Sequence, residues 1–154
     1  MTSTHNDQHF LDLTLHICVN ATMQISNDTS TLYERIGGEE AIQNLVKTFY
    51  RQMDELKEAK PIRQMHAKSL KVSEEKLFMF LSGWMGGPSL YMEKYGHSRL
   101  RRRHMPFAID ESARDQWMLC MKYALDETVE DQALRDELMQ AFYGVADFMR
   151  NRPD

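Results

Sequence analysis

The segment GHSRLRRRHMPF, residues 96–107, surrounds one histidine, His104, with two different chemistries. Four arginines precede this histidine, and an apolar Met-Pro-Phe corner follows it. Three interpretations are open: a nucleic-acid-binding patch, a solvated cationic face with a histidine of no special role, or a ligand for an iron whose cofactor carries acidic groups. A single histidine in a helical protein is more often a surface or core residue than a metal ligand. The remainder of the chain therefore has to decide among the three.

The composition limits these interpretations. The chain has 154 residues, of which 42% are apolar and 27% charged, which suits one globular domain with a core. A formal net charge of −4 argues against a protein devoted to nucleic acid, so the arginine run is a local feature. The two cysteines have no metal-ligand spacing and are too few for a disulfide framework, which favours a cytoplasmic protein. No apolar run reaches the roughly 18 residues that a membrane span needs, and no secretory signal is recognisable, so we expect no membrane partner.

The chain changes character near residue 31. We expect residues 1–31 to form an N-terminal extension and residues 32–150 to form a helical domain. Apolar and polar residues alternate over residues 11–25, with the period of a half-buried strand. A single strand has no sheet to join in an otherwise helical chain. The extension is therefore expected to be disordered and loosely attached, paired with a second molecule, or a translated upstream region.

A helical period dominates from residue 32 onward, and it predicts an all-α fold. The clearest signal is one apolar stripe in which Ile42, Phe49 and Met53 recur at helical spacing. Ser73 is the expected N-terminal cap of a helix through residues 76–85, and Gly86-Gly87-Pro88 is expected to end it. The expected elements are a short helix ended by Gly37-Gly38, helices over 38–56, 59–66, 76–85, 112–129 and 132–149, and a loop-rich segment up to residue 107.

Two aromatic residues carry hydrogen-bond donors on apolar helix faces. Tyr50 lies beside the stripe of the long helix, and Trp117 lies in the helix that follows the Met-Pro-Phe corner. Each is more often an ordinary core residue, but together they indicate a pocket that contains two donors. The sequence has no nucleotide-binding glycine motif, no HExxH motif and no cysteine cluster. The pattern alone therefore indicates a helical domain that could bind a cofactor.

Five motifs carry the interpretation further: LYERIGG, KTFYRQM, FLSGWMGGP, YGHSRLRRRHMPF and DQWMLCM. In this order and spacing, over residues 32–128, they resemble the group II truncated haemoglobins. The resemblance implies a truncated globin, a two-over-two helical sandwich with haem b between the helices. It also implies that His104 matches the proximal histidine that binds the haem iron, and that Tyr50 and Trp117 match the distal tyrosine and tryptophan.

The resemblance assigns roles to further residues. His66 stands at a corner position that is often tyrosine in this family, and Ser73 takes the place of the usual globin distal histidine. We expect His66 to hydrogen-bond Tyr50 or the bound ligand, and we favour this role over coordination of the iron. The implied haem contacts are the apolar residues Leu77, Phe80, Leu90, Met105 and Phe107, and the candidates for the haem propionates are Arg99, Arg103, Tyr91 and Lys76. Apolar residues on one side of His104 and guanidinium groups on the other suit a cofactor with an apolar face and two carboxylates.

The resemblance leaves two functions open. The first is reversible binding of dioxygen, nitric oxide or carbon monoxide by a monomer or weak dimer. The second is a redox enzyme that consumes nitric oxide or peroxide, which would need a separate reductase because the chain has no flavin or nicotinamide domain. A haem-free helical interaction domain is the third, less specific possibility. The sequence alone does not decide among them.

Overall fold

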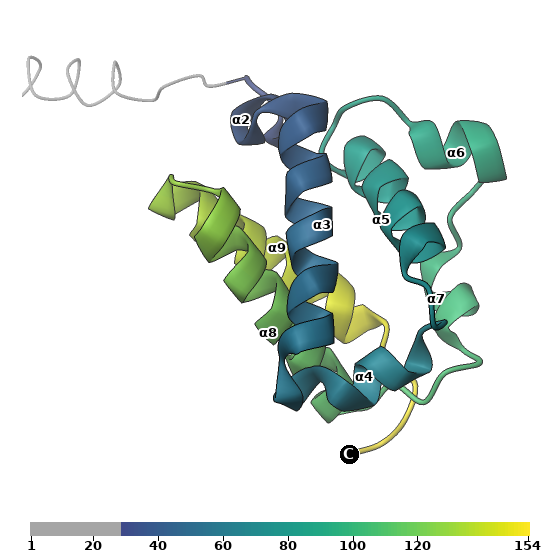
Figure 1. The fold of residues 1–154 in the computed structure, drawn as a ribbon. Helices are drawn as coiled ribbons and strands as arrows, with labels where there is room; N and C mark the ends of the chain where they lie inside the picture. The colour runs from purple at the N-terminus through teal and green to yellow at the C-terminus, as the bar shows by residue number, and fades with distance from the viewer. Residues whose placement is uncertain (1–28) are drawn as a thin grey trace, which may run out of the picture. The chain divides into compact units, whose positions relative to one another are not determined.

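Helix α3 (Gly38–Glu55) is the central element of the fold (Figure 1). The apolar stripe predicted for this helix is buried. A computed structural model describes residues 29–154 of the chain. Ile42, Leu45 and Phe49 are fully buried, because residues at this spacing fall on one face of a helix. This face packs mainly against α8 (Glu111–Thr128), and α3 also packs against α5 (Lys71–Trp84).

Two helix pairs build the domain. Helices α3 and α5 form one pair, and α8 packs with α9 (Gln132–Phe148) to form the other. The shorter elements are α2 (Leu32–Ile36), a 3-10 turn (Lys57–Ala59), α4 (Lys60–Met65), α6 (Leu90–Tyr95) and α7 (Leu100–His104). No strand occurs within residues 29–154, so the all-α prediction is confirmed for this part of the chain. Every helix in the same range is too short or too polar to cross a lipid bilayer.

Side-chain caps explain where three helices begin. Thr31 and Glu34 form a reciprocal capping box at the start of α2. Asp110 accepts a hydrogen bond from the backbone N–H of Ala113 at 2.8 Å and so starts α8. Asp131 caps α9 in the same way, through two backbone N–H groups. The starts of α8 and α9 differ from the sequence prediction by at most one residue.

Two predictions about the middle of the chain are wrong. Helix α5 begins at Lys71 and Leu70 occupies its N-cap position, so Ser73 lies inside the first turn and is not the cap. The segment predicted to be loop-rich contains α6 and α7, of six and five residues, which are too short to show a helical period. The predicted strand over residues 11–25 lies outside the described residues, and the boundary between extension and domain stays a prediction.

The turn after α5 is fitted closely against α2. The backbone N–H of Tyr33 donates to the carbonyl of Met85 at 2.9 Å. A Cβ atom on Gly87 would lie 2.3 Å from the Tyr33 ring, a distance that no side chain tolerates. Gly86 has a φ of 93°, in the region that favours glycine. The glycine pair therefore lets α2 fix the end of α5, the helix that carries Ser73 and Phe80.

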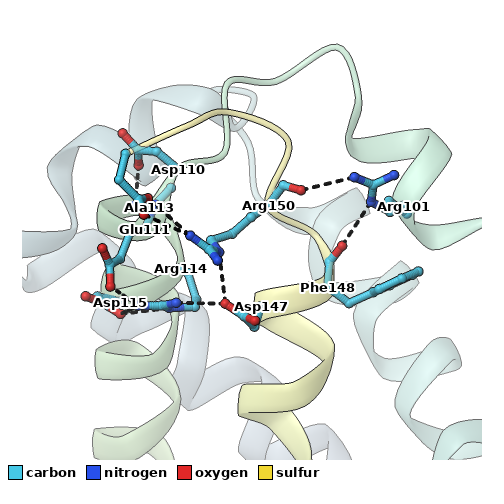
Figure 2. A network of polar contacts seen from close by, with 10 residues as sticks. Arg101, Asp110, Glu111, Ala113, Arg114, Asp115, Asp147, Phe148 and Arg150 are labelled. Carbon is cyan, nitrogen blue, oxygen red and sulfur yellow. Dashed lines mark hydrogen bonds and ion pairs between the residues drawn. The ribbon is translucent and has the colours of Figure 1, made fainter.

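A buried arginine joins the other helix pair. The Arg114 side chain is only 7% exposed, and it contacts three carboxylates around it, as Figure 2 shows. It donates to Asp147 of α9 at 2.7 Å and to Glu111 and Asp115 of its own helix at 2.9 and 3.0 Å. Its guanidinium also lies 5.0 Å from the centre of the Tyr143 ring. A charge this buried requires such partners, so the network ties the start of α8 to the end of α9.

Candidate functional site

His104 is the last residue of α7, and its ring is held by its own helix. The Nδ1 atom lies 2.7 Å from the carbonyl oxygen of Leu100, one turn earlier, and the side chain is half-buried. Because a carbonyl only accepts, Nδ1 must carry the proton, so the neutral ring has its lone pair on Nε2. A histidine with this orientation can bind a metal through Nε2, and the Nδ1 hydrogen bond makes Nε2 more basic.

Tyr50 lies at the centre of a polar and aromatic cluster. Its side chain is buried, and burial is the main cause that raises the pKa of its hydroxyl, with a hydrogen bond to Ser73 acting in the opposite direction. The Tyr50 ring meets the ring of His66 edge-on, with centroids 5.9 Å apart. It also meets Phe49 at 5.0 Å. The hydroxyl therefore stays protonated at physiological pH and is available as a hydrogen-bond donor.

His66 directly follows α4 and is anchored to that helix. Its Nδ1 lies 2.8 Å from the carbonyl oxygen of Ile62, which fixes the ring against Tyr50. Because this carbonyl only accepts a hydrogen bond, Nδ1 of the neutral ring carries the proton and Nε2 is left as an acceptor. The predicted hydrogen bond between His66 and Tyr50 stays a prediction, because the contact in the structure is between ring edges.

Trp117 continues the aromatic cluster toward the second helix pair. Its indole contacts Phe49 at 5.0 Å and Phe142 of α9 at 5.8 Å between ring centroids. Phe142 in turn stacks on Trp84 at 4.9 Å, with 19° between the ring planes. A continuous row of aromatic rings therefore runs from Tyr50 to Trp84. The structure brings Tyr50, His66 and Trp117 together in this way.

An open cleft of about 770 Å³ lies at the other end of this row, a volume within the range of ligand pockets. Trp84 and Phe80 of α5 form part of its lining. Residues of α9 contribute a second, mostly apolar wall, and the segment that leads into α7 contributes the cationic side. The remaining lining residues are His97, Ser98, Arg99, Leu100, Arg101, Arg102, Ala141, Gly144, Val145, Phe148 and Met149. His104 ends the helix that borders this cleft.

The predicted propionate partners occupy different positions. Arg99 lines the cleft and starts α7 with a φ of 43°, in a left-handed conformation, and its backbone N–H donates to Nδ1 of His97 at 3.1 Å. Arg103 turns elsewhere: it donates to the carbonyl of Ser98 at 2.9 Å and lies over the ring of Tyr91, 5.8 Å from its centre. The structure thus brings Arg99 to the cleft and pairs Arg103 with Tyr91 instead.

The predicted apolar contacts of the cofactor are divided. Phe80 lines the cleft, and Leu77 is half-buried against the core. Leu90 is half-buried on α6. Met105 and Phe107 directly follow α7 and remain 46% and 42% exposed. Two exposed apolar side chains beside His104 are consistent with an apolar ligand face at this corner, and their contact with the cofactor stays a prediction.

Three residues around the site were not predicted from the sequence. Trp84 falls in the predicted helix over 76–85 without a role in the site, yet it lines the cleft and ends the row of rings. Val145 falls in the predicted helix over 132–149, and it also lines the cleft. Asn151 was not considered, although its side chain contacts the carbonyl of His104 from 47 residues away in the sequence. Helical periodicity identifies the first two faces, but nothing in the sequence signals the third contact.

Comparison with known proteins gives a consistent result. A family model described as bacterial-like globin matches residues 31–151. The cold-adapted truncated hemoglobin from Pseudoalteromonas haloplanktis is 45% identical with a TM-score of 0.78, and the match covers 80% of this chain and 99% of that chain. The group II 2-on-2 hemoglobin from Agrobacterium tumefaciens is 42% identical with a TM-score of 0.78, over 84% of this chain and 100% of that chain.

A third solved structure is the truncated oxygen-avid haemoglobin from Bacillus subtilis. It is 37% identical with a TM-score of 0.71, and the match covers 79% of this chain and 100% of that chain. The resemblance inferred from the five sequence motifs is therefore confirmed, as is the two-over-two helical fold. The chain belongs to the bacterial-like globin family, and within it to the group II truncated haemoglobins.

Proposed function

We propose that this protein binds haem b through Nε2 of His104 and reversibly binds dioxygen and other diatomic ligands beside Tyr50, Trp117 and His66. Membership of the globin family implies haem and diatomic gas binding in general. The observation that carries the specific assignment is the 2.7 Å contact between Nδ1 of His104 and the Leu100 carbonyl, which leaves Nε2 free for a metal.

The side chains around His104 fit the chemistry of a haem. A haem is apolar across its face and carries two carboxylates at one edge. The cleft beside α7 has apolar walls from α5 and α9, and Arg99, Arg101 and Arg102 line its remaining side. Guanidinium groups pair well with carboxylates. We assign Arg99 to the propionates, and we keep Arg103 and Tyr91 as a second candidate pair because they stack on each other next to the same segment.

A haem held by His104 would supply ferrous iron, whose chemistry is the reversible binding of diatomic molecules with partial negative charge passed to dioxygen. The residues of this chain then act as donors. Burial keeps the Tyr50 hydroxyl protonated, and the Trp117 indole can only donate. His66 meets the Tyr50 ring edge-on, and Ser73 lies near enough to the Tyr50 hydroxyl to lower its pKa. Fixed donors next to developing negative charge stabilise the bound state and slow its release.

Reversible binding is favoured over the redox-enzyme alternative. One relative of this chain is a truncated oxygen-avid haemoglobin, and in this chain two side chains that carry hydrogen-bond donors, Tyr50 and Trp117, both pack against Phe49 in one aromatic cluster. Nitric oxide or peroxide turnover would in addition require electrons from a separate reductase. We therefore propose retention of dioxygen as the main property of the site.

The proposal is tested by the visible spectrum of the purified ferrous protein as dioxygen is added and then removed. The expected result is a reversible change in the wild type and loss of stable haem binding in His104→Ala. His97→Ala is the matched control, because His97 lies in the same basic segment and lines the cleft but precedes α7. Equal behaviour of the two variants would contradict the assignment of His104.

A further inference from the structure

The chain that follows α9 returns to the helix that carries His104. Arg101 of α7 donates through Nε to the carbonyl of Phe148 at 3.1 Å and through Nη2 to the carbonyl of Arg150 at 3.4 Å (Figure 2). Its guanidinium also lies 5.6 Å from the centre of the Phe148 ring. Because the last carbonyls of a helix have no partners inside the helix, Arg101 satisfies the carbonyl of Phe148 at the end of α9, and it also binds the carbonyl of Arg150 beyond that end.

Asn151 makes the most direct connection to His104. Its Nδ2 donates to the carbonyl of His104 at 3.1 Å and to the carbonyl of Phe107 at 3.0 Å, while its Oδ1 accepts from the backbone N–H of Ile109 at 3.0 Å. Its own backbone N–H donates to the Ile109 carbonyl at 2.9 Å. One side chain thus spans the whole corner between α7 and α8.

The orientation of this amide follows from its partners. Nδ2 faces two carbonyl acceptors, and Oδ1 faces one N–H donor. The reverse orientation would place the amide oxygen against two carbonyl oxygens, which cannot donate a hydrogen bond to it. The backbone N–H of Arg152 also donates to the Ile109 carbonyl, at 3.1 Å. We call residues 147–152 the C-terminal clasp.

The clasp is itself anchored on the rest of the domain. Asp147 accepts from the buried Arg114 at 2.7 Å. Arg150 Nε lies 2.9 Å from the same carboxylate, as an ion pair whose angle is too poor for a hydrogen bond, and its Nη1 bonds Asp154. Figure 2 shows Arg114 and Arg150 converging on Asp147. The clasp therefore links α7 to the helix pair formed by α8 and α9.

Helix α7 needs such external support. It has five residues, and an isolated helix of about one turn is not stable in water. The His104 ring is oriented by a bond to Leu100 within the same turn, so any fraying of α7 would also turn the ring. Asn151 holds the carbonyl at the end of this turn.

We propose that Asn151 is a positioning residue for His104, which acts through the His104 carbonyl to fix the imidazole and thereby the bond from Nε2 to iron. This inference rests on the proposed function, in which His104 is the iron ligand. It adds that the strength of this bond is set by a side chain outside the haem pocket.

Three Asn151 variants test the inference. Asn151→Ala removes all three side-chain bonds, and Asn151→Asp keeps the size and the acceptor for Ile109 but opposes a carboxylate oxygen to two carbonyls. Asn151→Ser covers the case in which the alanine variant does not fold. Arg152→Ala is the control, since the Arg152 side chain is exposed and its backbone bond to Ile109 is retained.

The first measurement needs no haem. In the apoprotein, the Ile109 amide donates to Oδ1 of Asn151, so it should exchange with solvent on the order of tenfold faster in Asn151→Ala and Asn151→Ser, as expected for the loss of about one net hydrogen bond, and near the wild-type rate in Asn151→Asp. The Phe107 amide donates to the His104 carbonyl and should exchange faster in all three variants. The second measurement is the iron–histidine stretching band of the ferrous unliganded protein by resonance Raman. We expect the band to broaden and move to lower frequency, and haem transfer to apomyoglobin to be roughly tenfold faster. Arg152→Ala should behave as wild type.

The outcomes separate the two levels of the proposal. A wild-type band and a wild-type haem-transfer rate in the Asn151 variants would overturn the inference, even if the variants unfold at lower temperature, because Asn151 would then be structural only. A His104→Ala protein that keeps the iron–histidine band would overturn the proposed function and this inference with it. A changed band in the Asn151 variants, with its complete loss in His104→Ala, would support both.

Discussion

Trp117→Phe isolates one hydrogen bond, because the substitution keeps a ring in the same position. Phenylalanine can retain the contacts with Phe49 and Phe142, whose ring centroids now lie 5.0 and 5.8 Å from the indole. We expect it to cost about 1 kcal/mol of stability from the smaller ring. The indole N–H is lost completely. A hydrogen bond to a partly charged acceptor is worth roughly 1.5–3 kcal/mol, so dioxygen should dissociate roughly ten- to a hundredfold faster.

Stopped-flow measurement of dioxygen release from the ferrous protein tests this expectation. Carbon monoxide acquires less negative charge, so its release should change much less in the same variant. Tyr123→Phe is the matched control: it deletes a hydrogen-bond donor from an exposed aromatic ring of the same helix, outside the cleft. Unchanged dioxygen release in Trp117→Phe, or an equal change in Tyr123→Phe, would refute the proposed role of the Trp117 indole.

Three further predictions concern the frame that holds the site. Gly87→Ala should lower the melting temperature of the apoprotein, because the new methyl group would collide with the α2 tyrosine ring at 2.3 Å. The hydrogen bond from Arg114 holds the pKa of Asp147 below its usual value. The ionised carboxylate therefore stabilises the folded protein at a pH above about 4, the pKa of Asp in the unfolded chain. This stabilisation is lost as the pH falls through the lower pKa of the folded state. Thermal melts of Asp147→Asn and wild type should therefore differ most at neutral pH and converge in acid. Burial raises the pKa of the Cys120 thiol to about 11, so in a Cys18→Ser background Ellman's reagent at pH 8 should modify it only after unfolding.

Each of these predictions has a control or a contradicting result. Gly144→Ala adds a methyl group that meets no heavy atom within 4 Å and replaces a helical glycine, so its melting temperature should stay equal or rise. Asp136→Asn removes an exposed carboxylate of α9 and should leave the pH dependence of stability unchanged. A constant difference between Asp147→Asn and wild type down to pH 2 would refute the role of the ion pair. Fast modification of native Cys120 would show that its helix opens readily.

The long helices could be predicted because their apolar residues repeat at a period that only a helix satisfies. The stripe from Ile42 to Met53 is the clearest case, and α3 covers it completely. Helices α6 and α7 could not be predicted in this way, since six and five residues contain too few turns to establish a period. Ser73 shows a different failure: a serine before a helical run resembles a cap, but here it lies within α5, and its side chain lowers the pKa of the Tyr50 hydroxyl against the larger effect of burial.

The part of the candidate site that lies within one short segment of the chain could be predicted from the sequence. Residues 96–107 contain the proposed iron ligand His104, its apolar neighbours and four arginines within 12 residues, so the sequence could point to this segment. The partners of Asn151 lie 42 to 47 residues away, and only the fold brings them together. The same holds for the row of rings from Tyr50 to Trp84, which crosses between both helix pairs.

We propose that His104 binds the haem iron through Nε2, with Tyr50 and Trp117 beside the bound ligand. A crystal structure of the haem-loaded ferrous protein with dioxygen bound would test this assignment. We expect a bond from Nε2 of His104 to the iron, with Nδ1 still on the Leu100 carbonyl, and both donors within hydrogen-bonding distance of the ligand. Iron bonded to His66 or His97 in place of His104, or a ligand that neither donor reaches, would contradict it.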